Sequence, residues 1–121
     1  MGKRILVVDD DELVLMALRE LLTPEGYEVH TVSGGSEALE RLEKYGYDLL
    51  VLDIIMPEMD GFQLCKRIRE KENYREKPIV FLTAKSREED RAKGIDAGAN
   101  LFLSKPISPE KLLNIILDAI K

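Results

Sequence analysis

Leu49-Leu50-Val51-Leu52-Asp53 is a run of four apolar residues that ends in a carboxylate. Two other runs, Ile5-Leu6-Val7-Val8 and Ile79-Val80-Phe81-Leu82, have the same unbroken apolar character. Continuous rather than alternating apolar residues indicate strands that are buried on both faces, as in a parallel sheet covered by helices. We therefore expect a parallel sheet at the centre of the fold.

Outward from these runs, five expected strands alternate with five amphipathic segments of helical character. The expected strands cover residues 4–9, 27–32, 48–53, 78–83 and 99–104. In the second of them, Glu28 and His30 alternate with Val29 and Thr31, a pattern that is typical of an edge strand. Strict alternation with right-handed crossovers predicts a three-layer α/β sandwich around a five-stranded parallel sheet. Two common strand orders fit this pattern, and the periodicity does not choose between them.

The expected helices carry recognisable ends. Asp11 opens the first helix, where a negative charge is favourable, and Pro24 ends that helix at or just before Thr23. Further caps are expected from three pairs with suitable spacing: Ser86 with Glu89, Asp60 with Gln63, and Ser108 with Pro109. Three glycines follow helices at positions where a left-handed closing residue is often wanted: Gly26, Gly46 and Gly98.

Polar residues stand at the ends of four expected strands. The first strand ends in Asp9-Asp10, the third in Asp53 and the fourth in Thr83, and Lys105 follows the fifth at once. The carboxyl ends of parallel strands meet at one edge of the sheet, and the binding sites of open α/β sheets lie there. Neighbouring strands are about 4.8 Å apart, so carboxylates from two adjacent strand ends can converge on one small ion.

Such a set of side chains suits phosphoryl transfer. Clustered carboxylates raise one another's pKa unless a positive charge lies among them, and Mg²⁺ fits best because it uses one or two carboxylates, waters and phosphate oxygens. A lysine ammonium adds a second positive charge, and a threonine hydroxyl adds a donor. A carboxylate can itself be the nucleophile and form an aspartyl-phosphate. The sequence therefore predicts a phosphoryl-transfer site that holds a divalent cation.

Each member of this set also has an ordinary structural explanation. An aspartate after a strand is most often a helix cap or a turn residue, and this is our interpretation of Asp11. A single threonine or lysine at such a position would carry no functional meaning. The functional hypothesis depends on the polar residues at all four strand ends taken together. A purely structural explanation does not account for their occurrence at the same edge of the sheet.

Four segments together resemble the receiver domain of two-component response regulators, in the manner of single-domain chemotaxis regulators. In chain order they are Ile5-Leu6-Val7-Val8-Asp9-Asp10, Asp53-Ile54-Ile55-Met56-Pro57-Glu58-Met59-Asp60-Gly61, Leu82-Thr83-Ala84, and Gly98-Ala99 through Lys105-Pro106. The resemblance covers the whole chain, so one receiver domain is expected over residues 1–121. It implies a flavodoxin-like fold with strand order 2-1-3-4-5.

By this resemblance, Asp53 is the phosphoacceptor. Asp10 and the backbone carbonyl of Ile55 are implied to join Asp53 as direct Mg²⁺ ligands, and Asp9 is implied to act mainly through a bound water. The resemblance therefore implies Mg²⁺ as the cofactor of the predicted site.

The same resemblance assigns roles to residues beyond the metal. Lys105 is implied to pair with the phosphoryl oxygens, and Thr83 to donate a hydrogen bond to one of them. Phe102, three residues before Lys105, matches the position of an aromatic switch, although a phenylalanine in a buried strand is more often simply part of the core. The Lys105-Pro106 peptide bond is typically cis in this family.

The implied function is a signalling switch rather than an enzyme. It would accept a phosphoryl group from the phosphohistidine of a sensor kinase, assist its own phosphorylation and slow dephosphorylation, and change the surface that a downstream target protein or effector domain binds. Two alternatives share this chemistry: an intermediate carrier in a phosphorelay, and the receiver part of a larger regulator. The resemblance also implies a cytoplasmic protein that is a monomer or a weak phosphorylation-dependent dimer.

Composition argues against several other functions. The 121 residues suit one compact domain, and the net charge of −5 argues against direct binding of nucleic acid. The apolar runs are far too short to cross a membrane. The single Cys65 cannot form an internal disulfide, which is compatible with a reducing cytoplasm, and its helical spacing with Phe62 and Ile68 predicts a buried, inert thiol.

Two other classes of protein fit the residues less well. A phosphatase with an aspartate nucleophile generally has a second aspartate two residues later, where this chain has Ile55. A flavin or nucleotide binder needs a Gly-rich or Ser/Thr-rich loop after the first strand, where Asp9-Asp10-Asp11 would repel a phosphate.

Two further residues attract attention. His30, on an expected edge strand, is a weak candidate for a phosphohistidine. Gly94 lies inside the fourth expected helix and costs that helix about 1 kcal/mol relative to alanine. The glycine either leaves the helix loose or permits close packing against it, and the sequence does not separate these two explanations.

Overall fold

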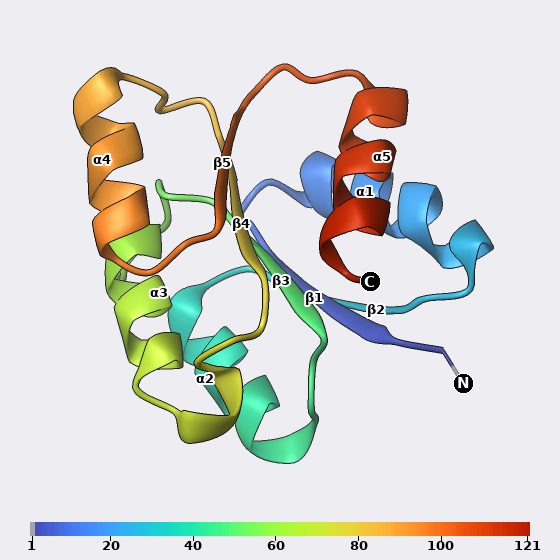
Figure 1. Ribbon diagram of the computed structural model, residues 1–121, viewed down its shortest axis with the longest axis horizontal. Coiled ribbons are helices and arrows are strands. Elements are labelled where there is room, and N and C mark those ends of the chain that lie inside the picture. The colour runs from blue at the N-terminus through green and yellow to red at the C-terminus, as the bar shows by residue number, and fades with distance from the viewer. Residues whose placement is uncertain (1) are drawn as a thin grey trace.

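The computed structural model describes residues 2–121, and five parallel strands form its central layer (Figure 1). The strands are β1 (Arg4–Val8), β2 (Glu28–Val32), β3 (Leu49–Leu52), β4 (Ile79–Thr83) and β5 (Leu101–Ser104). Their order across the sheet is β2-β1-β3-β4-β5, which confirms the order implied by the family resemblance. β2 lies at one edge of the sheet, as its alternating pattern predicts.

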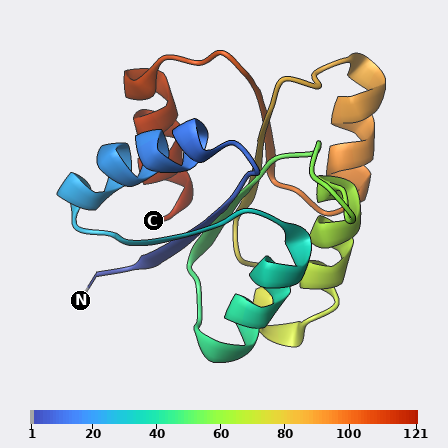
Figure 2. The ribbon, with the colours of Figure 1, turned by 180° about the vertical axis from the view of Figure 1, so that it is seen from behind.

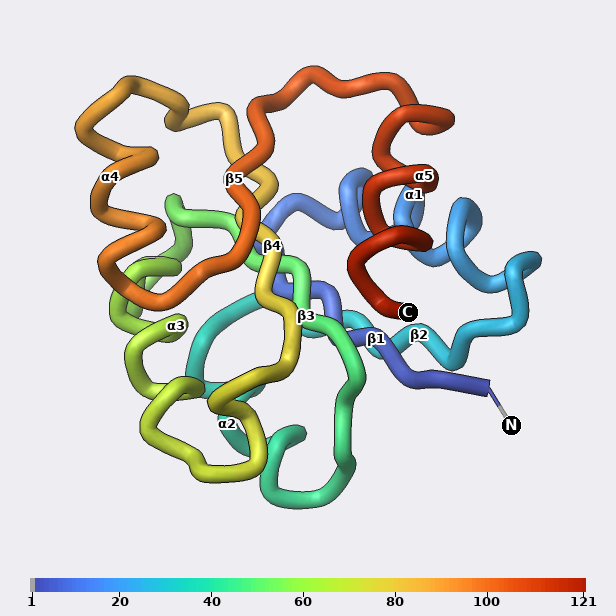
Figure 3. The backbone as a smooth tube through the Cα atoms, viewed as in Figure 1, coloured from blue at the N-terminus to red at the C-terminus, as the bar shows by residue number. Residues whose placement is uncertain are grey.

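Helices cover both faces of this sheet. Within the described residues the α-helices are α1 (Glu12–Leu22), α2 (Gly35–Lys44), α3 (Gly61–Arg69), α4 (Glu88–Asp96) and α5 (Pro109–Ala119). α1 and α5 lie on one face, and α2, α3 and α4 lie on the other (Figures 1 and 2). The backbone trace shows the same three layers, with α1 and α5 in contact (Figure 3). The predicted three-layer α/β sandwich is therefore confirmed.

The core has two halves, one on each face of the sheet. Leu50 and Leu52 of β3 pack into the half under α2 and α3, whereas Leu49 and Val51 pack into the half under α1 and α5. Successive side chains of a strand point to opposite faces, so a strand covered on both faces needs apolar residues at every position. The unbroken apolar runs follow from this arrangement. No helix in the part of the chain that the structure describes has the length and apolar character needed to span a membrane.

Most helix ends follow the expected caps. Asp11 caps α1 by accepting a hydrogen bond from the backbone N–H of Leu13 at 2.9 Å, and α1 ends at Leu22, just before Thr23. The reciprocal pair at the start of α3 and the serine cap of α5 are also present: Asp60 with Gln63, and Ser108 accepting from Lys111 N–H. These caps fix where each helix leaves the carboxyl edge of the sheet.

Two expectations about helix ends are wrong. The Ser86–Glu89 capping box does not form, because Asp90 turns back to accept a hydrogen bond from the N–H of Arg87 at 3.2 Å, and α4 begins one residue later, at Glu88. Gly46 does not adopt a left-handed conformation, since α2 already ends at Lys44 and the residue after it, Tyr45, has extended backbone. Gly26 and Gly98 do have positive φ angles, of 96° and 111°.

Candidate functional site

The acidic residues that follow β1 and β3 are held by backbone hydrogen bonds that continue the sheet. The N–H of Asp53 donates to the carbonyl of Val8 at 3.0 Å, and the N–H of Asp9 donates to the carbonyl of Val32 at 3.2 Å. β1 and β3 are direct neighbours, with Val8 opposite Leu52. The two aspartates are therefore fixed side by side at the carboxyl edge of the sheet.

Three carboxylates meet at this edge. One oxygen from each of Asp9, Asp10 and Asp53 lies within 4.8 Å of the other two. The Asp9 and Asp53 side chains are buried, with residue exposures of 2% and 7%, whereas Asp10 is exposed. The cluster thus has a dry floor and one side that is open to solvent.

Lys105 reaches into the cluster from the loop after β5. Its Nζ lies 2.8 Å from Oδ2 of Asp9 and 3.3 Å from Oδ2 of Asp53. The Lys105 N–H donates to the carbonyl of Thr83 at 2.9 Å, which fixes the start of the lysine side chain beside β4. The Lys105-Pro106 peptide bond is cis, as the family resemblance implies.

Burial and neighbouring charges shift the pKa values of Asp9 and Lys105 in this cluster. Burial raises the pKa of Asp9, and the nearby Asp53 charge adds to the rise, while the hydrogen bond from Lys105 opposes it. For Lys105, burial disfavours the charged form, but the hydrogen bond to Asp9 and the charge of Asp53 outweigh it and raise the pKa of the ammonium. One ammonium faces three carboxylates.

A hard divalent cation fits these residues. Carboxylate oxygens from adjacent loops lie close enough together for one ion, and Asp10 leaves an open side for waters or phosphate oxygens. A divalent charge would stabilise the ionised form of Asp9, whose pKa is raised mainly by burial and further by the nearby Asp53 charge. The structure thus brings together Asp9, Asp10 and Asp53, as the strand ends predict.

Thr83 and Phe102 lie between this cluster and α4. Thr83 ends β4 and is fully buried, and its Oγ1 accepts a hydrogen bond from the N–H of Lys85 at 3.1 Å. Phe102 on β5 is also buried and packs against Phe81 of β4, with ring centroids 5.9 Å apart. Phe102 thus lies in the core, and its role as a switch stays a prediction.

The residues two positions after Asp53 and Thr83 differ in their surroundings. Ile55 is a surface residue, 59% exposed. The Nζ of Lys85 lies 3.8 Å from Oδ1 of Asp90, so its ammonium pairs with that carboxylate. The sequence does not reveal Asp90 as an ion-pair partner. It lies in a run of charged residues that suggests an exposed helix face, yet the residue is only 2% exposed.

Gly61 is a second residue that sequence reasoning misses. A side-chain carbon at position 61 would collide with the carbonyl oxygen of Asp53 and would lie 2.8 Å from the Cα of Ile54. The Gly61 N–H also donates to the carbonyl of Ile54 at 2.9 Å. The first turn of α3 is therefore pressed directly against the backbone of the acidic loop. The segment that resembles the receiver family includes Gly61, but the sequence gives no physical reason for a glycine there beyond its place after a helix cap.

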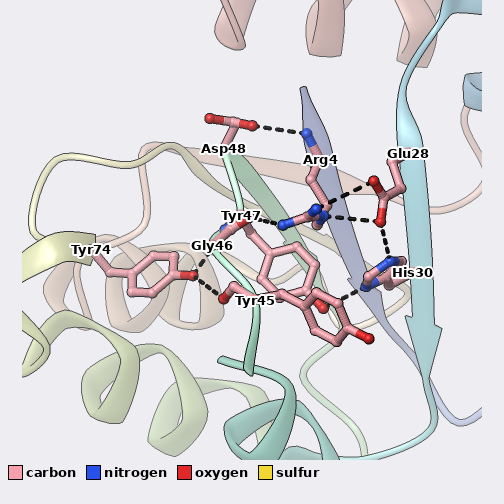
Figure 4. A network of polar contacts seen from close by, with 8 residues as sticks. All are labelled: Arg4, Glu28, His30, Tyr45, Gly46, Tyr47, Asp48 and Tyr74. Carbon is pink, nitrogen blue, oxygen red and sulfur yellow. Dashed lines mark hydrogen bonds and ion pairs between the residues drawn. The ribbon is translucent and has the colours of Figure 1, made fainter. Parts of the chain in front are cut away.

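His30 belongs to a separate polar network at the opposite end of the strands (Figure 4). Its Nε2 lies 2.7 Å from Oε2 of Glu28, and its Nδ1 lies 2.7 Å from the hydroxyl of Tyr47. Arg4 pairs with the same glutamate at 3.0 Å, and this hydrogen bond holds the pKa of Glu28 below its usual value. The network ties β1, β2 and the segment before β3 together, which gives His30 a structural role.

Cys65 is a residue of α3, and its side chain lies in the core, as its helical spacing predicts. Its side chain is fully buried and its Sγ lies 3.4 Å from the carbonyl of Ala97. Burial raises the pKa of the thiol to about 11. The buried position that the sequence predicts is therefore confirmed, and the raised pKa disfavours the reactive thiolate.

Comparisons with known proteins show the family to which this chain is similar. A model of the response regulator receiver domain matches residues 5–117. The alkaline phosphatase synthesis transcriptional regulatory protein PhoP of Bacillus subtilis is 42% identical over 112 residues, which are 93% of this chain and 46% of that protein. The chain spans about half the length of the curated relatives it matches.

Solved structures agree in fold over almost the whole chain. A putative response regulator from Chloroflexus aurantiacus has a TM-score of 0.93 at 36% identity, covering 99% of this chain and 98% of that one. The receiver domain of sensor histidine kinase PA1611 from Pseudomonas aeruginosa has a TM-score of 0.89 at 33% identity, with the same coverage. That structure holds a magnesium ion in its active-site cleft.

The chain belongs to the response regulator receiver domain family. Proteins of this family are phosphoacceptor switches of two-component signalling, bind Mg²⁺ in an acidic active site, and act with histidine kinases and effectors. The resemblance of the four sequence segments and the flavodoxin-like fold are thereby confirmed.

Proposed function

We propose that the protein is a phosphorylation-controlled switch in which Asp53 accepts a phosphoryl group from the phosphohistidine of a sensor kinase. The observation that carries this proposal is the position of Asp53, buried at the centre of the acidic cluster with Lys105 Nζ 3.3 Å from its Oδ2. In the transfer, an Asp53 carboxylate oxygen attacks phosphorus as the P–N bond breaks, and the histidine nitrogen keeps the electron pair.

Three residues of the chain would hold Mg²⁺ directly: Asp10, Asp53 and the backbone carbonyl of Ile55. Asp9 would act through a bound water. When bound, the ion neutralises negative charge on the carboxylates and on the incoming phosphoryl oxygens. The geometry of the cluster supports this proposal, because one oxygen from each of Asp9, Asp10 and Asp53 lies within 4.8 Å of the other two.

Lys105 and Thr83 would bind the phosphoryl group itself. The Lys105 ammonium already lies between Asp9 and Asp53, so a phosphoryl group on Asp53 would meet it without a large movement. Thr83 would exchange its hydrogen bond with the Lys85 N–H for one donated to a phosphoryl oxygen. That exchange would release the loop between β4 and α4.

The switch should extend from Asp53 to the face made by α4, β5 and α5. The Phe102 ring is already buried against Phe81, so phosphorylation would draw Thr83 toward the phosphoryl group and favour this inward position of the ring over an outward, exposed one. Amide NMR spectra with Mg²⁺, with and without the phosphoryl mimic beryllofluoride, should therefore differ at Asp53 and across this face. Changes restricted to the neighbours of Asp53 would contradict the coupling.

The phosphorylated form should be long-lived. Hydrolysis needs a water in line with the phosphorus, and the exposed Ile55 beside that path offers no hydrogen bond and shields the phosphoryl group. Ile55→Asn should speed the loss of phosphate by about tenfold, the factor that corresponds to one hydrogen bond of about 1.4 kcal/mol. The measurement follows phosphate loss after the donor is removed.

Equal rates, or a faster wild type, would contradict the role of Ile55 in shielding. Lys85→Ala is the matched variant for the other flanking position. Because the Lys85 ammonium pairs with Asp90 in the structure, we expect this variant to change the rate less than Ile55→Asn.

The wider setting of the switch also belongs to the proposal. We place one receiver domain over residues 1–121, in the cytoplasm, as a monomer or weak phosphorylation-dependent dimer without direct nucleic-acid binding. Two alternative settings are a phosphorelay carrier and the receiver part of a larger regulator. The second is supported by the longer chains of the relatives. Identifying which protein binds the phosphorylated form, an effector or a histidine phosphotransfer protein, would decide between them.

A further inference from the structure

The ring of Phe102 occupies the space where a side chain of α4 would otherwise stand. A side-chain carbon built at Gly94 would lie 2.8 Å and 3.1 Å from two ring carbons of Phe102, and 3.2 Å from a ring carbon of Phe81. These distances are shorter than ordinary van der Waals contact. The close-packing explanation for Gly94 is therefore correct, and the helix comes near β5 because position 94 has no side chain.

Arg91, one turn earlier on α4, contacts the same ring. Its guanidinium carbon lies 5.2 Å from the centroid of the Phe102 ring, and its Nη1 donates a hydrogen bond to the Phe102 carbonyl at 3.2 Å. Residues three apart on a helix share a face, so Arg91 and Gly94 act on Phe102 together. With Phe81 they form the walls of a slot, which we call the ring slot, around the Phe102 side chain.

The ring slot lies on the same face of the sheet as Thr83. Phe81 is paired with Phe102 across β4 and β5, and Thr83 stands two residues after Phe81. Side chains two residues apart on a strand point to the same face. The Thr83 side chain and the Phe102 ring therefore border the same space between β4 and α4. A movement of one changes the room that is available to the other.

A glycine at position 94 has no backbone requirement, because its φ is not positive. A helix with glycine at an interior position is less stable than one with alanine there, so Gly94 weakens α4. The structure shows one gain in return, the room that Gly94 leaves for the Phe102 ring. The buried residues of α4 are only Asp90 and Gly94, so the ring slot is a principal contact of this helix.

We propose that Gly94 is a positioning residue that admits Phe102 to its inward position, so that the side chain at position 94 sets the balance between inward and outward rings. This inference rests on the proposed switch, in which the inward ring accompanies phosphorylation. A side chain at 94 would favour the outward ring. Because coupling between two sites is reciprocal, it would also weaken the response of Asp53 to a phosphoryl group or its mimic.

The test compares Gly94→Ala, Phe102→Ala and the double variant in the full chain. Beryllofluoride affinity is measured in Mg²⁺ by NMR titration, and the ring position by nuclear Overhauser contacts between the rings of Phe102 and Phe81. Gly94→Ala should weaken beryllofluoride binding by about fivefold or more and reduce the ring contacts. In the Phe102→Ala background, Gly94→Ala should leave the affinity unchanged. Asp96→Ala, which like Gly94→Ala raises the helix propensity of α4 but lies at an exposed position, is the control for helix stability and should leave both readouts unchanged.

Three outcomes would overturn this inference. Unchanged ring contacts in Gly94→Ala would show that position 94 does not place the ring. An equal loss of affinity in the presence and absence of Phe102 would show that Gly94 acts through α4 alone, as would an equal loss in Asp96→Ala. A wild type that binds no beryllofluoride would instead contradict the proposed switch, while the ring contacts would still test the role of Gly94.

Discussion

A protein in which Asp53 is replaced by alanine is expected to take up no phosphoryl group from acetyl phosphate and Mg²⁺, whereas the wild type takes up one. Asp53 is the proposed nucleophile and a proposed metal ligand, and its Oδ2 lies 3.3 Å from the Lys105 ammonium, so the variant would lose both roles together. Intact-mass spectrometry over a time course measures the uptake directly.

Matched variants distinguish the loss of the phosphoacceptor from the loss of any one acidic side chain on the protein. Asp96→Ala, at an exposed position of α4, should take up phosphate as the wild type does. Asp10→Ala should take it up slowly and should improve as Mg²⁺ is raised, because it would lack a proposed metal ligand but keep the proposed nucleophile. Undiminished, Mg²⁺-independent uptake by Asp53→Ala would remove the basis of the proposed function.

Replacement of Gly61 by alanine should be the most damaging of the glycine-to-alanine changes near the site. The added carbon would collide with the Asp53 carbonyl oxygen, and a backbone atom cannot turn away as a flexible side chain can. We expect a loss of about 3 kcal/mol or more in the free energy of unfolding, together with weaker phosphate uptake, because the acidic loop must shift. Urea denaturation measures the first effect.

Gly46→Ala is the matched control for this prediction. An added carbon at position 46 meets nothing within 4 Å, and its φ is not positive, so alanine should be neutral or stabilise by about 0.4–1 kcal/mol. If Gly61→Ala proved as stable and as readily phosphorylated as Gly46→Ala, the close contact between α3 and the acidic loop would not constrain the site.

The order of the elements and the place of the site could both be predicted from the sequence. A strand such as β3, buried on both faces, must be apolar throughout, so Leu49 to Leu52 predict its setting without any knowledge of its neighbours. Asp53 and Lys105 follow their strands directly, so the edge of the sheet determines where they lie. The strand order needed the family resemblance, because both orders share the same periodicity.

Details that depend on contacts between distant elements could not be predicted. Asp90, rather than Glu89, caps α4 because its carboxylate is buried beside Arg87 and Lys85, and the spacing of acidic residues carries no sign of this. Glycine is needed at position 94 because a ring from β5 lies there, and at position 61 because a carbonyl from the loop after β3 lies there. Each of these contacts exists only once the layers have packed.

The most direct test of the account is to locate the phosphoryl group on the wild-type protein. After incubation with acetyl phosphate and Mg²⁺, borohydride reduction converts an acyl phosphate to an alcohol, and peptide fragmentation then reports which aspartate has changed. The account predicts that the reduction occurs at Asp53 alone and disappears when Mg²⁺ is chelated. Modification at Asp9 or Asp10 in place of Asp53, or none at any aspartate, would contradict it.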